Sequence, residues 1–331
     1  MSAFTTSLAH NLDIAHDIYV SVVIPIYNEE ACLETLYKRL IPVLQGLNKP
    51  WELILTNDGS QDRSSEILKS FHERLPSQIR IIEFSKNFGQ HMAIMAAFER
   101  ARGRVIVNLD ADLQNPPEEI PSLLAKFEEG FDLVSGYREN RNDAFLRKFI
   151  SKLSNVTREY MTGIKMRDHG CMLKAYSREI VQKIVACKEN STFITVLAYS
   201  FANNPTDIPV KHEAREEGIS KYTPLKLIEY SLDMFTSSST IPLRLFTLFG
   251  FIVSALSALL VAYLVIRRLI VGPEAEGLFT LFAIAFFLIS VAITGIGVVG
   301  EYIGRIYQVV RERPRFSIKE VLEDIRTPHN E

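Results

Sequence analysis

Two carboxylates stand one residue apart at the end of an apolar run of the sequence. The run 104–109 is followed at once by Asp110 and Asp112, and Gln114 comes two residues later. In an extended backbone, residues i and i+2 point to the same side, so both carboxylates would face one ligand. Hard oxygen donors of this kind suit Mg²⁺ or Mn²⁺, which usually arrive together with substrate phosphates. The spacing therefore predicts a divalent-cation site that handles a phosphorylated substrate.

The elements that position this pair are predicted to be alternating strands and helices. Short apolar runs rich in β-branched residues predict strands at 19–26, 51–56, 79–84, 104–109 and 131–135. Helical patterns lie between them at 29–47, 62–75, 90–102 and 117–129. The alternation predicts an α/β fold with a mainly parallel sheet, flanked by helices and binding its ligands at the carboxyl ends of the strands.

Polar clusters also follow the first two predicted strands. Pro25, Tyr27, Asn28 and Glu29 surround the end of the first, and Asp58 follows the second. Each cluster alone has a structural explanation, because Asn28 could cap a helix and an Asp-Gly pair is a common turn. Together with Asp110 they place three polar clusters along one edge of one sheet, and turn formation alone does not explain that arrangement.

Two long uncharged stretches follow the α/β region. Residues 246–266 are 21 residues without a charge, and residues 278–300 are 23. Each can cross a hydrocarbon core of ~30 Å at ~1.5 Å per residue. Buried core helices are the alternative, but a soluble helix rarely runs so long without a polar face. We predict a two-helix transmembrane hairpin.

Charge and cysteine content indicate where the chain works. Basic residues flank the hairpin mainly outside its linker, and the first 17 residues lack the apolar core of a signal peptide. Both observations favour a multi-pass protein of the cytoplasmic membrane, with the catalytic domain and both termini in the cytoplasm. Three cysteines without metal-type spacing suit a reducing compartment. The net charge of -2 gives no sign of nucleic acid binding.

Two amphipathic segments, 143–164 and 223–242, adjoin the predicted hairpin. Periodicity alone does not separate helices packed on the domain from helices lying on an anionic bilayer, but the position beside the hairpin favours the bilayer. We expect an N-terminal extension (1–18), a catalytic domain (19–222) that contains the interfacial helix 143–164, a juxtamembrane helix (223–242), the hairpin (243–303) and a cytoplasmic tail (304–331).

The segment 215–222 combines a glycine with Arg215, Ser220 and Lys221. Two cations and a hydroxyl in a flexible loop suit phosphate binding. The structural alternative is an ordinary solvated charged loop.

The strand-end motifs resemble those of family 2 glycosyltransferases, which have a GT-A-type fold, and most closely the polyprenyl-phosphate glycosyltransferases. The resemblance runs from about Val20 to Arg315 and includes the hairpin. It is carried further by Asn-Phe-Gly-Gln-His at 87–91, the run 93–96, Gln-Asn-Pro-Pro-Glu-Glu-Ile-Pro at 114–121 and His-Gly-Cys-Met-Leu at 169–173. These motifs are most similar to the members that transfer 4-deoxy-4-formamido-L-arabinose to undecaprenyl phosphate for lipid A modification. Glucose or mannose is the alternative sugar.

The resemblance implies an inverting transfer from a UDP-sugar to undecaprenyl phosphate, and a homotetramer whose tail after Gly300 reaches a neighbouring subunit. It assigns nucleotide-sugar binding to Pro25, Tyr27, Asn28, Glu29 and Asp58. The divalent cation and the diphosphate fall to Asp110, Asp112 and Gln114, with Arg215, Ser220 and Lys221 on the phosphates and Asp112 and Lys221 in catalytic roles. Asn57 departs from the pattern, since many relatives have a second Asp there.

Asp168 matches the position that the family offers as catalytic base. A phosphate monoester has its second pKa near ~6, so the lipid phosphate is largely dianionic at neutral pH and needs orientation more than deprotonation. Asp168 is therefore either a base or a residue that positions the acceptor. Arg138 and Arg141 are candidates for binding the lipid phosphate, or are general membrane-surface cations.

Two other functions compete with this interpretation. A processive polysaccharide synthase of the same fold needs a translocating channel, for which two helices per chain are too few, and the sequence has no Gln-x-x-Arg-Trp segment. A catalytically silent membrane scaffold is disfavoured by the paired carboxylates and the intact phosphate loop.

Overall fold

The computed structural model describes residues 18–138, 168, 170–187, 194–213, 241–271, 278–310 and 314–324. The chain divides into two compact units, one combining Met1–Ser220 with Pro314–Glu331 and the other spanning Lys221–Arg313. Several predicted features lie outside the described residues: the interfacial helix 143–164, most of the juxtamembrane helix, Arg141, Arg215, Ser220 and Lys221.

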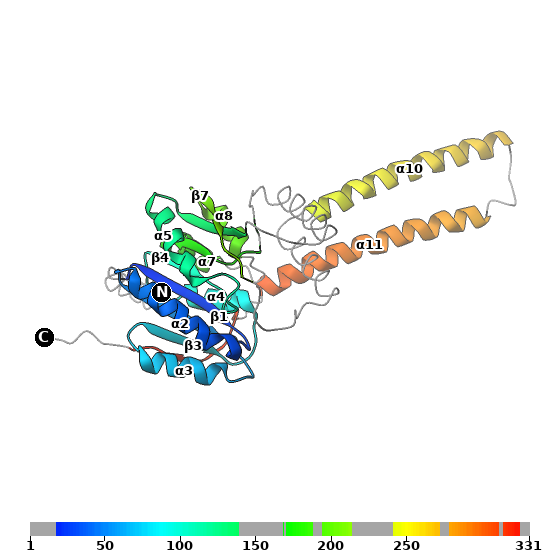
Figure 1. Cartoon of the computed structure of the whole chain (residues 1–331). Helices are drawn as coiled ribbons and strands as arrows, with labels where there is room; N and C mark the ends of the chain where they lie inside the picture. Colours follow the sequence, from blue (N-terminus) through cyan, green and yellow to red (C-terminus); the bar gives the residue numbers. More distant parts are fainter. Residues whose placement is uncertain are drawn as a thin grey trace, which may run out of the picture. The chain divides into compact units, whose positions relative to one another are not determined.

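Within the described residues of the first unit, eight strands form one sheet (Figure 1) in the order β7-β5-β6-β4-β1-β2-β3-β8. The strands are β1 (Val20–Ile26), β2 (Trp51–Asn57), β3 (Ile79–Phe84), β4 (Val105–Asn108), β5 (Leu133–Arg138), β6 (Lys174–Ser177), β7 (Pro205–Val210) and β8 (Ile318–Leu322). The central strands β4, β1, β2 and β3 are parallel, β6 is antiparallel to β4 and β5, β7 is parallel to β5, and β8 is antiparallel to β3. The predicted α/β fold with a mainly parallel sheet is confirmed.

Helices cover both faces of this sheet. The described ones are α2 (Glu30–Gly46), α3 (Ser64–Arg74), α4 (Gln90–Phe98), η1 (Pro117–Glu119), α5 (Ile120–Glu128), α7 (Arg178–Ala186) and α8 (Ile194–Phe201). Helices α2, α3 and α5 share one apolar cluster with the β1 residues Val22 and Ile24, whereas α4, α7 and α8 share another with Val23. Strands buried on both faces read as continuous apolar runs, which is why β1 shows no alternation in the sequence.

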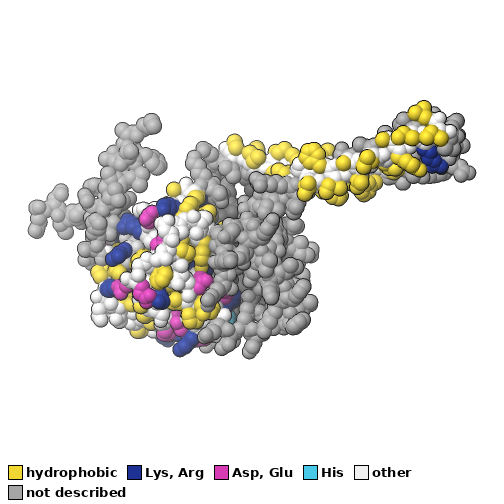
Figure 2. All heavy atoms as spheres, turned by 90° about the horizontal axis from the view of Figure 1, so that it is seen from above, with side chains coloured by type: hydrophobic (Ala, Val, Ile, Leu, Met, Phe, Trp, Pro, Cys, Tyr) yellow, Lys and Arg dark blue, Asp and Glu magenta, His cyan; other side chains and the backbone are white. Residues whose placement is uncertain are grey.

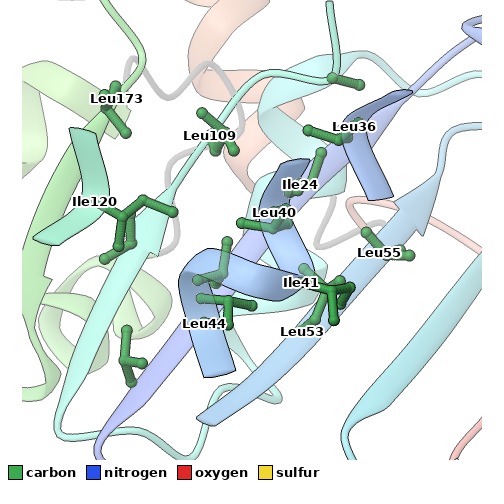
Figure 3. Packing of buried hydrophobic residues seen from close by; sticks show 14 of the residues in the cluster. Ile24, Leu36, Leu40, Ile41, Leu44, Leu53, Leu55, Leu109, Ile120 and Leu173 are labelled. Atoms are coloured by element: carbon green, nitrogen blue, oxygen red, sulfur yellow. The ribbon is translucent and has the colours of Figure 1, made fainter. Parts of the chain in front are cut away.

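Helix α2 shows how the periodic pattern becomes a core. Leu36, Leu40 and Leu44 recur at four-residue spacing, and all three are at most 3% exposed. Figure 3 shows them directed at the strands, next to Ile24 and Leu53. Each such side chain contributes about 1.5–3 kcal/mol on burial, so this face of α2 fixes the helix against the sheet.

The C-terminal strand β8 was not predicted, because residues 304–331 were expected to form a cytoplasmic tail. Helix α11 instead continues to Val310, and Ile318–Leu322 pair with β3 of the same chain. Surface and buried ion pairs join the strand to the sheet, Lys69 with Glu320 at 3.0 Å and Arg80 with Glu323 at 2.8 Å. A five-residue strand of mixed polarity is too short to show a clear hydrophobic pattern in the sequence. Its partner, β3, also lies far away in the chain.

The second unit contains two long helices, α10 (Ile241–Val271) and α11 (Leu278–Val310), which lie side by side in Figure 1. The Phe246 ring of α10 fills the space beside Gly295 of α11. Hydrophobic side chains run along the helices in Figure 2, and large ones such as Phe251, Leu269 and Ile296 are 71–81% exposed. Among the described residues, the segment Ile284–Gly304 qualifies by length and hydropathy to cross a membrane.

Candidate active site

The acidic pair lies in a turn that follows β4. The strand ends at Asn108, two residues before Asp110, and Leu113 has a positive φ of 61°. The carboxylate of Asp112 turns back to accept a hydrogen bond from the Gln114 backbone N–H at 3.2 Å. The prediction that an extended backbone aligns the two carboxylates is therefore wrong. A tight turn, rather than strand alternation, brings Asp110 and Asp112 together.

Negative charge is concentrated around Asp110. Burial, together with the neighbouring charges of Asp112 and Glu29, raises the pKa of Asp110 to about 7, although a hydrogen bond from Gln90 acts in the opposite direction. This hydrogen bond runs from Gln90 Nε2 to Asp110 Oδ1 at 2.7 Å. A bound cation would relieve the repulsion within the cluster.

The described residues contain no group of three or more His, Cys, Asp or Glu side chains arranged as a metal centre. Two carboxylates and an amide nevertheless fit Mg²⁺ or Mn²⁺, because these ions commonly keep waters and take further oxygens from substrate phosphates. The partial exposure of Asp110, Asp112 and Gln114 leaves room for such ligands.

Asp58, at the end of β2, organises the loop between β3 and α4, which we call the 85–89 loop. Its buried carboxylate accepts hydrogen bonds from the backbone N–H groups of Phe88 and Gly89 at 2.7 and 2.9 Å and from Asn87 Nδ2 at 2.9 Å. Burial raises the pKa of Asp58, and the two backbone N–H groups act in the opposite direction. Gly59 permits the close approach, since a Cβ there would lie 2.5 Å from the Lys86 carbonyl carbon.

The 85–89 loop thereby joins two predicted site residues. It holds Asp58 through its backbone, and α4 begins directly after it at Gln90, the residue that bonds Asp110. No role was predicted for Gln90. Its position in the sequence could have indicated one, because residues 87–91 follow the third predicted strand at the same edge of the sheet as the acidic clusters.

The loops after β1 and β2 are bonded to each other. Asn28 adopts a positive φ of 54°, its Oδ1 accepts from the Gln61 N–H at 2.8 Å, and its own N–H donates to Ser60 Oγ at 3.0 Å. Helix α2 is capped at Glu29 without a side-chain hydrogen bond, so the alternative role of Asn28 as a helix cap is wrong. Half-buried Tyr27 and Glu29 share this edge with Asn28.

Pro25 and Asn57 lie inside the sheet. Pro25 is buried within β1 opposite Thr56. The buried amide of Asn57 donates to Glu83 Oε2 at 2.8 Å and accepts from the Ser60 N–H at 3.0 Å. The amide is thus engaged with protein groups. Its Nδ2 supplies a donor that matches the Glu83 carboxylate.

Asp168 and Arg138 pair with each other. Arg138 Nε and Nη2 donate to the two carboxylate oxygens at 2.6 and 2.9 Å, and the Gly170 N–H adds a third bond at 2.9 Å. Burial acts to raise the pKa of Asp168, but the Arg138 guanidinium and the Gly170 N–H outweigh it and lower the pKa to about 2. A carboxylate of such low proton affinity is a weak base, so the geometry favours a positioning role.

Arg39 of α2 holds the chain around Gln114. It donates two hydrogen bonds to Glu118 and two to Glu213, at 2.9–3.1 Å. The Glu213 N–H in turn donates to the Gln114 carbonyl at 2.9 Å. Glu213 stands two residues before Arg215, the first residue of the predicted phosphate loop. This contact joins three separate parts of the chain and was not predicted from the sequence.

A buried lysine lies beside the same edge. Lys174 of β6 is 0% exposed, is paired with Asn108 in the sheet and donates to Ser135 Oγ at 2.5 Å. Burial lowers its pKa, and the charges of Asp168 and Asp110 act against this shift. The acidic edge therefore has a buried amino group near it.

Comparison with known proteins agrees with this arrangement. The family model described as glycosyl transferase family 2 matches residues 21–185. Enzymes named undecaprenyl-phosphate 4-deoxy-4-formamido-L-arabinose transferase are 46% identical, from Pseudomonas fluorescens over 92% of this chain and 90% of theirs, and from Salmonella choleraesuis over 94% and 96%.

Among solved structures, glucosyl-3-phosphoglycerate synthase from Mycobacterium tuberculosis with Mn²⁺, UDP-glucose and phosphoglyceric acid is 18% identical, with a TM-score of 0.46, over 66% of this chain and 78% of that one. That likeness is too distant to assign chemistry. The sequence similarity, in contrast, shows the family. The chain belongs to glycosyl transferase family 2, and over most of its length it is similar to the undecaprenyl-phosphate 4-deoxy-4-formamido-L-arabinose transferases.

Proposed function

We propose that this glycosyltransferase moves 4-deoxy-4-formamido-L-arabinose from a UDP-sugar to undecaprenyl phosphate, with inversion, at the cytoplasmic face of the bacterial inner membrane. The observation that carries the proposal is 46% identity over 92–94% of the chain to enzymes of that name. The product would serve lipid A modification.

The donor would bind along the carboxyl edge of β1, β2 and β4. Pro25, Tyr27, Asn28, Glu29 and Asp58 would hold the nucleotide. The support is that Asp58 accepts hydrogen bonds from Phe88 and Gly89, and that Asp110 accepts one from Gln90, the next residue. One continuous segment therefore positions both carboxylates.

Asp110 and Asp112, with Gln114, would hold a divalent cation, which when bound supplies positive charge to the diphosphate of the departing UDP. Arg215, Ser220 and Lys221 would bind the donor phosphates. Arg39 would keep the chain leading to these residues next to Gln114, through Glu213.

The acceptor phosphate would attack the anomeric carbon in one displacement. It is largely dianionic at neutral pH, since its second pKa is near ~6, and does not need a strong base. Asp168 would orient Arg138, and Arg138 and Arg141 would screen and position the lipid phosphate. The pairing of Arg138 with Asp168 at 2.6 Å supports this division of roles.

An acceptor with a membrane-embedded tail requires the catalytic edge at headgroup height. We propose that α10 and α11 cross the membrane as a hairpin with both termini in the cytoplasm, and that the segments 143–164 and 223–242 lie at the bilayer surface. The exposed apolar side chains of both helices support this, because contiguous apolar surface of that extent needs an apolar environment. We further propose a homotetramer.

A panel of UDP-sugars tests the assignment. Full-length purified enzyme is incubated with undecaprenyl phosphate, Mg²⁺ or Mn²⁺ and each sugar nucleotide, and the glycolipid product is identified by mass spectrometry. Preference for the formamido-arabinose donor is the expected result. Preference for UDP-glucose or a mannose donor would overturn the sugar assignment, and no transfer from any donor would overturn the proposed reaction.

A further inference from the structure

The chain that leaves α11 returns to the catalytic edge of the sheet. Six residues after α11 ends at Val310, the Phe316 ring stacks on Phe84, the last residue of β3, with centroids 5.1 Å apart and planes inclined by 14°. One residue further on, the Ser317 carbonyl accepts a hydrogen bond from the Ser85 N–H at 3.0 Å. The C-terminal segment therefore supports the first residue of the 85–89 loop.

The contact continues through the loop by a second aromatic pair. Phe84 meets Phe88 edge-to-face, with centroids 5.6 Å apart and an interplanar angle of 88°. Aromatic pairs of this kind contribute about 0.5–1.5 kcal/mol beyond their buried area. The three rings thus form one contiguous row, in the order Phe316, Phe84 and Phe88. We call it the aromatic row, and it runs from the segment before β8 to the 85–89 loop.

This row ends on the candidate donor site. The Phe88 N–H donates to Asp58 Oδ1 at 2.7 Å, and two residues later Gln90 donates to Asp110 Oδ1 at 2.7 Å. The loop is thus placed by its hydrogen bonds to Asp58 and Ser317 and by the packing of Phe88 on Phe84. Displacing Phe88 would displace the groups that fix both carboxylates.

We propose that Phe316 is a positioning residue for donor binding. Through Phe84 and Phe88 it keeps the 85–89 loop, and Gln90 directly after it, in the positions that fix Asp58 for the nucleotide and Asp110 for the cation and diphosphate. The segment following the predicted membrane hairpin is then part of the support of the donor site, besides closing the edge of the sheet. This inference rests on the proposed function, since it requires that the edge bind UDP.

The other end of β8 supplies a matched control. Glu323 accepts two hydrogen bonds from Arg80 at 2.8 and 3.0 Å, at the end of β3 opposite to the 85–89 loop, because the two strands are antiparallel. Glu323→Ala weakens the attachment of β8 without touching the aromatic row. Glu320→Gln alters only the exposed pair with Lys69, whose contribution is small.

The experiment measures the affinity of the full-length protein for UDP with Mg²⁺, by calorimetry, together with thermal unfolding of the same samples. Phe316→Ala is expected to weaken UDP binding by about 2- to 10-fold, the equivalent of one lost aromatic pair. Phe316→Tyr keeps the ring and is expected to bind UDP like the wild type. Glu323→Ala and Glu320→Gln are expected to keep wild-type affinity, even where Glu323→Ala lowers the unfolding temperature.

Kinetics give a second readout. Phe316→Ala is expected to raise the KM for the donor more than it lowers kcat, because the ring acts on placement of the nucleotide. Unchanged UDP affinity in Phe316→Ala, or equal losses in Phe316→Ala and Glu323→Ala, would overturn the inference and leave β8 with a stabilising role only. Failure of the wild type to bind UDP would instead overturn the proposed function.

Discussion

Arg138 and Asp168 form a two-point ion pair, with Nε–Oδ2 and Nη2–Oδ1 distances of 2.6 and 2.9 Å. From the sequence, Arg138 was a candidate for binding the lipid phosphate or a general membrane-surface cation, and Asp168 was either a base or a residue that positions the acceptor. The pairing makes them a single unit instead. Its carboxylate is 8% exposed and its guanidinium 18%, so the pair is held in a largely desolvated position where geometry is well defined.

The first prediction concerns pH and Asp168. We expect wild type and Asp168→Asn to share the shape of their pH–rate profiles between about pH 5 and 8, because the limb near ~6 belongs to the lipid phosphate. Asp168→Asn lowers the rate through misplacement of Arg138. The profiles are measured as initial rates at saturating donor across this pH range. If the rise in rate near pH ~6 disappears in Asp168→Asn, Asp168 is the base.

The same pair predicts a pH-dependent stability. The pKa of Asp168 is about 2 in the folded protein and about 3.9 in an unfolded chain. The folded state therefore favours the ionised form, and the stabilisation is complete above about pH 4 and is lost as the pH falls from there toward 2. Denaturant titrations should show the difference between wild type and Asp168→Asn shrinking by roughly 2 kcal/mol over that interval. A difference that stays constant would contradict the depressed pKa.

The second prediction concerns the acidic turn. Asp112→Ala removes one of two hard oxygen donors for the cation, so we expect transferase activity to fall by at least about 100-fold at any Mg²⁺ or Mn²⁺ concentration. Glu129→Ala, which removes an exposed carboxylate paired with Lys126 on the surface, serves as the control and should keep full activity. Full activity of Asp112→Ala with Mn²⁺ present would refute the metal role.

The third prediction concerns Asn57, where the family resemblance led us to expect Asp. Asn57→Asp places a second carboxylate against buried Glu83, which now accepts from the Asn57 amide at 2.8 Å. We expect a loss of about 1–3 kcal/mol in unfolding free energy from repulsion and the lost hydrogen bond. The double variant Asn57→Asp/Glu83→Gln restores a donor and should recover most of the loss. Without such recovery, the Asn57–Glu83 contact would not be the cause.

The fourth prediction compares two glycines with positive φ. Gly59 has φ +66° and Gly130 has φ +102°, but a Cβ at Gly59 would clash with Lys86 and Asn87 whereas a Cβ at Gly130 meets nothing within 4 Å. Alanine costs about 1 kcal/mol of backbone strain at either site. Gly59→Ala should cost a further 1–3 kcal/mol or so and weaken UDP binding, because it pushes the 85–89 loop off Asp58. Equal effects of the two variants on UDP affinity would contradict this explanation.

Much of the fold was predictable because its signals are local. The runs at 20–26, 51–57 and 79–84 are mainly apolar and buried, and strands β1, β2 and β3 begin and end within a residue or so of the predictions. Strands β6, β7 and β8 were not predicted. They pair with partners far away in the sequence and have four to six residues each, too few for a clear period.

The candidate site divides in the same way. Residue types and strand-end positions were enough to predict a site at Asp58, Asp110 and Asp112, since such a prediction depends on chemistry and on the end of an apolar run. The partners of those residues did not follow from types alone. Gln90 reaches Asp110, Phe88 reaches Asp58, and Arg138 reaches Asp168 only because the sheet places different loops side by side.

By itself, the sequence determined that this chain carries acidic residues at strand ends and two long apolar helices, because composition and spacing are local properties of the chain. Tertiary structure alone decided how Asp110 and Asp112 come together, through a turn with Leu113 at positive φ, and what supports the 85–89 loop that holds Asp58. That support comes from Phe316, more than two hundred residues away from Phe84 in the chain. A long-range contact of that kind leaves no periodic trace, because its stabilisation exists only once both segments are folded.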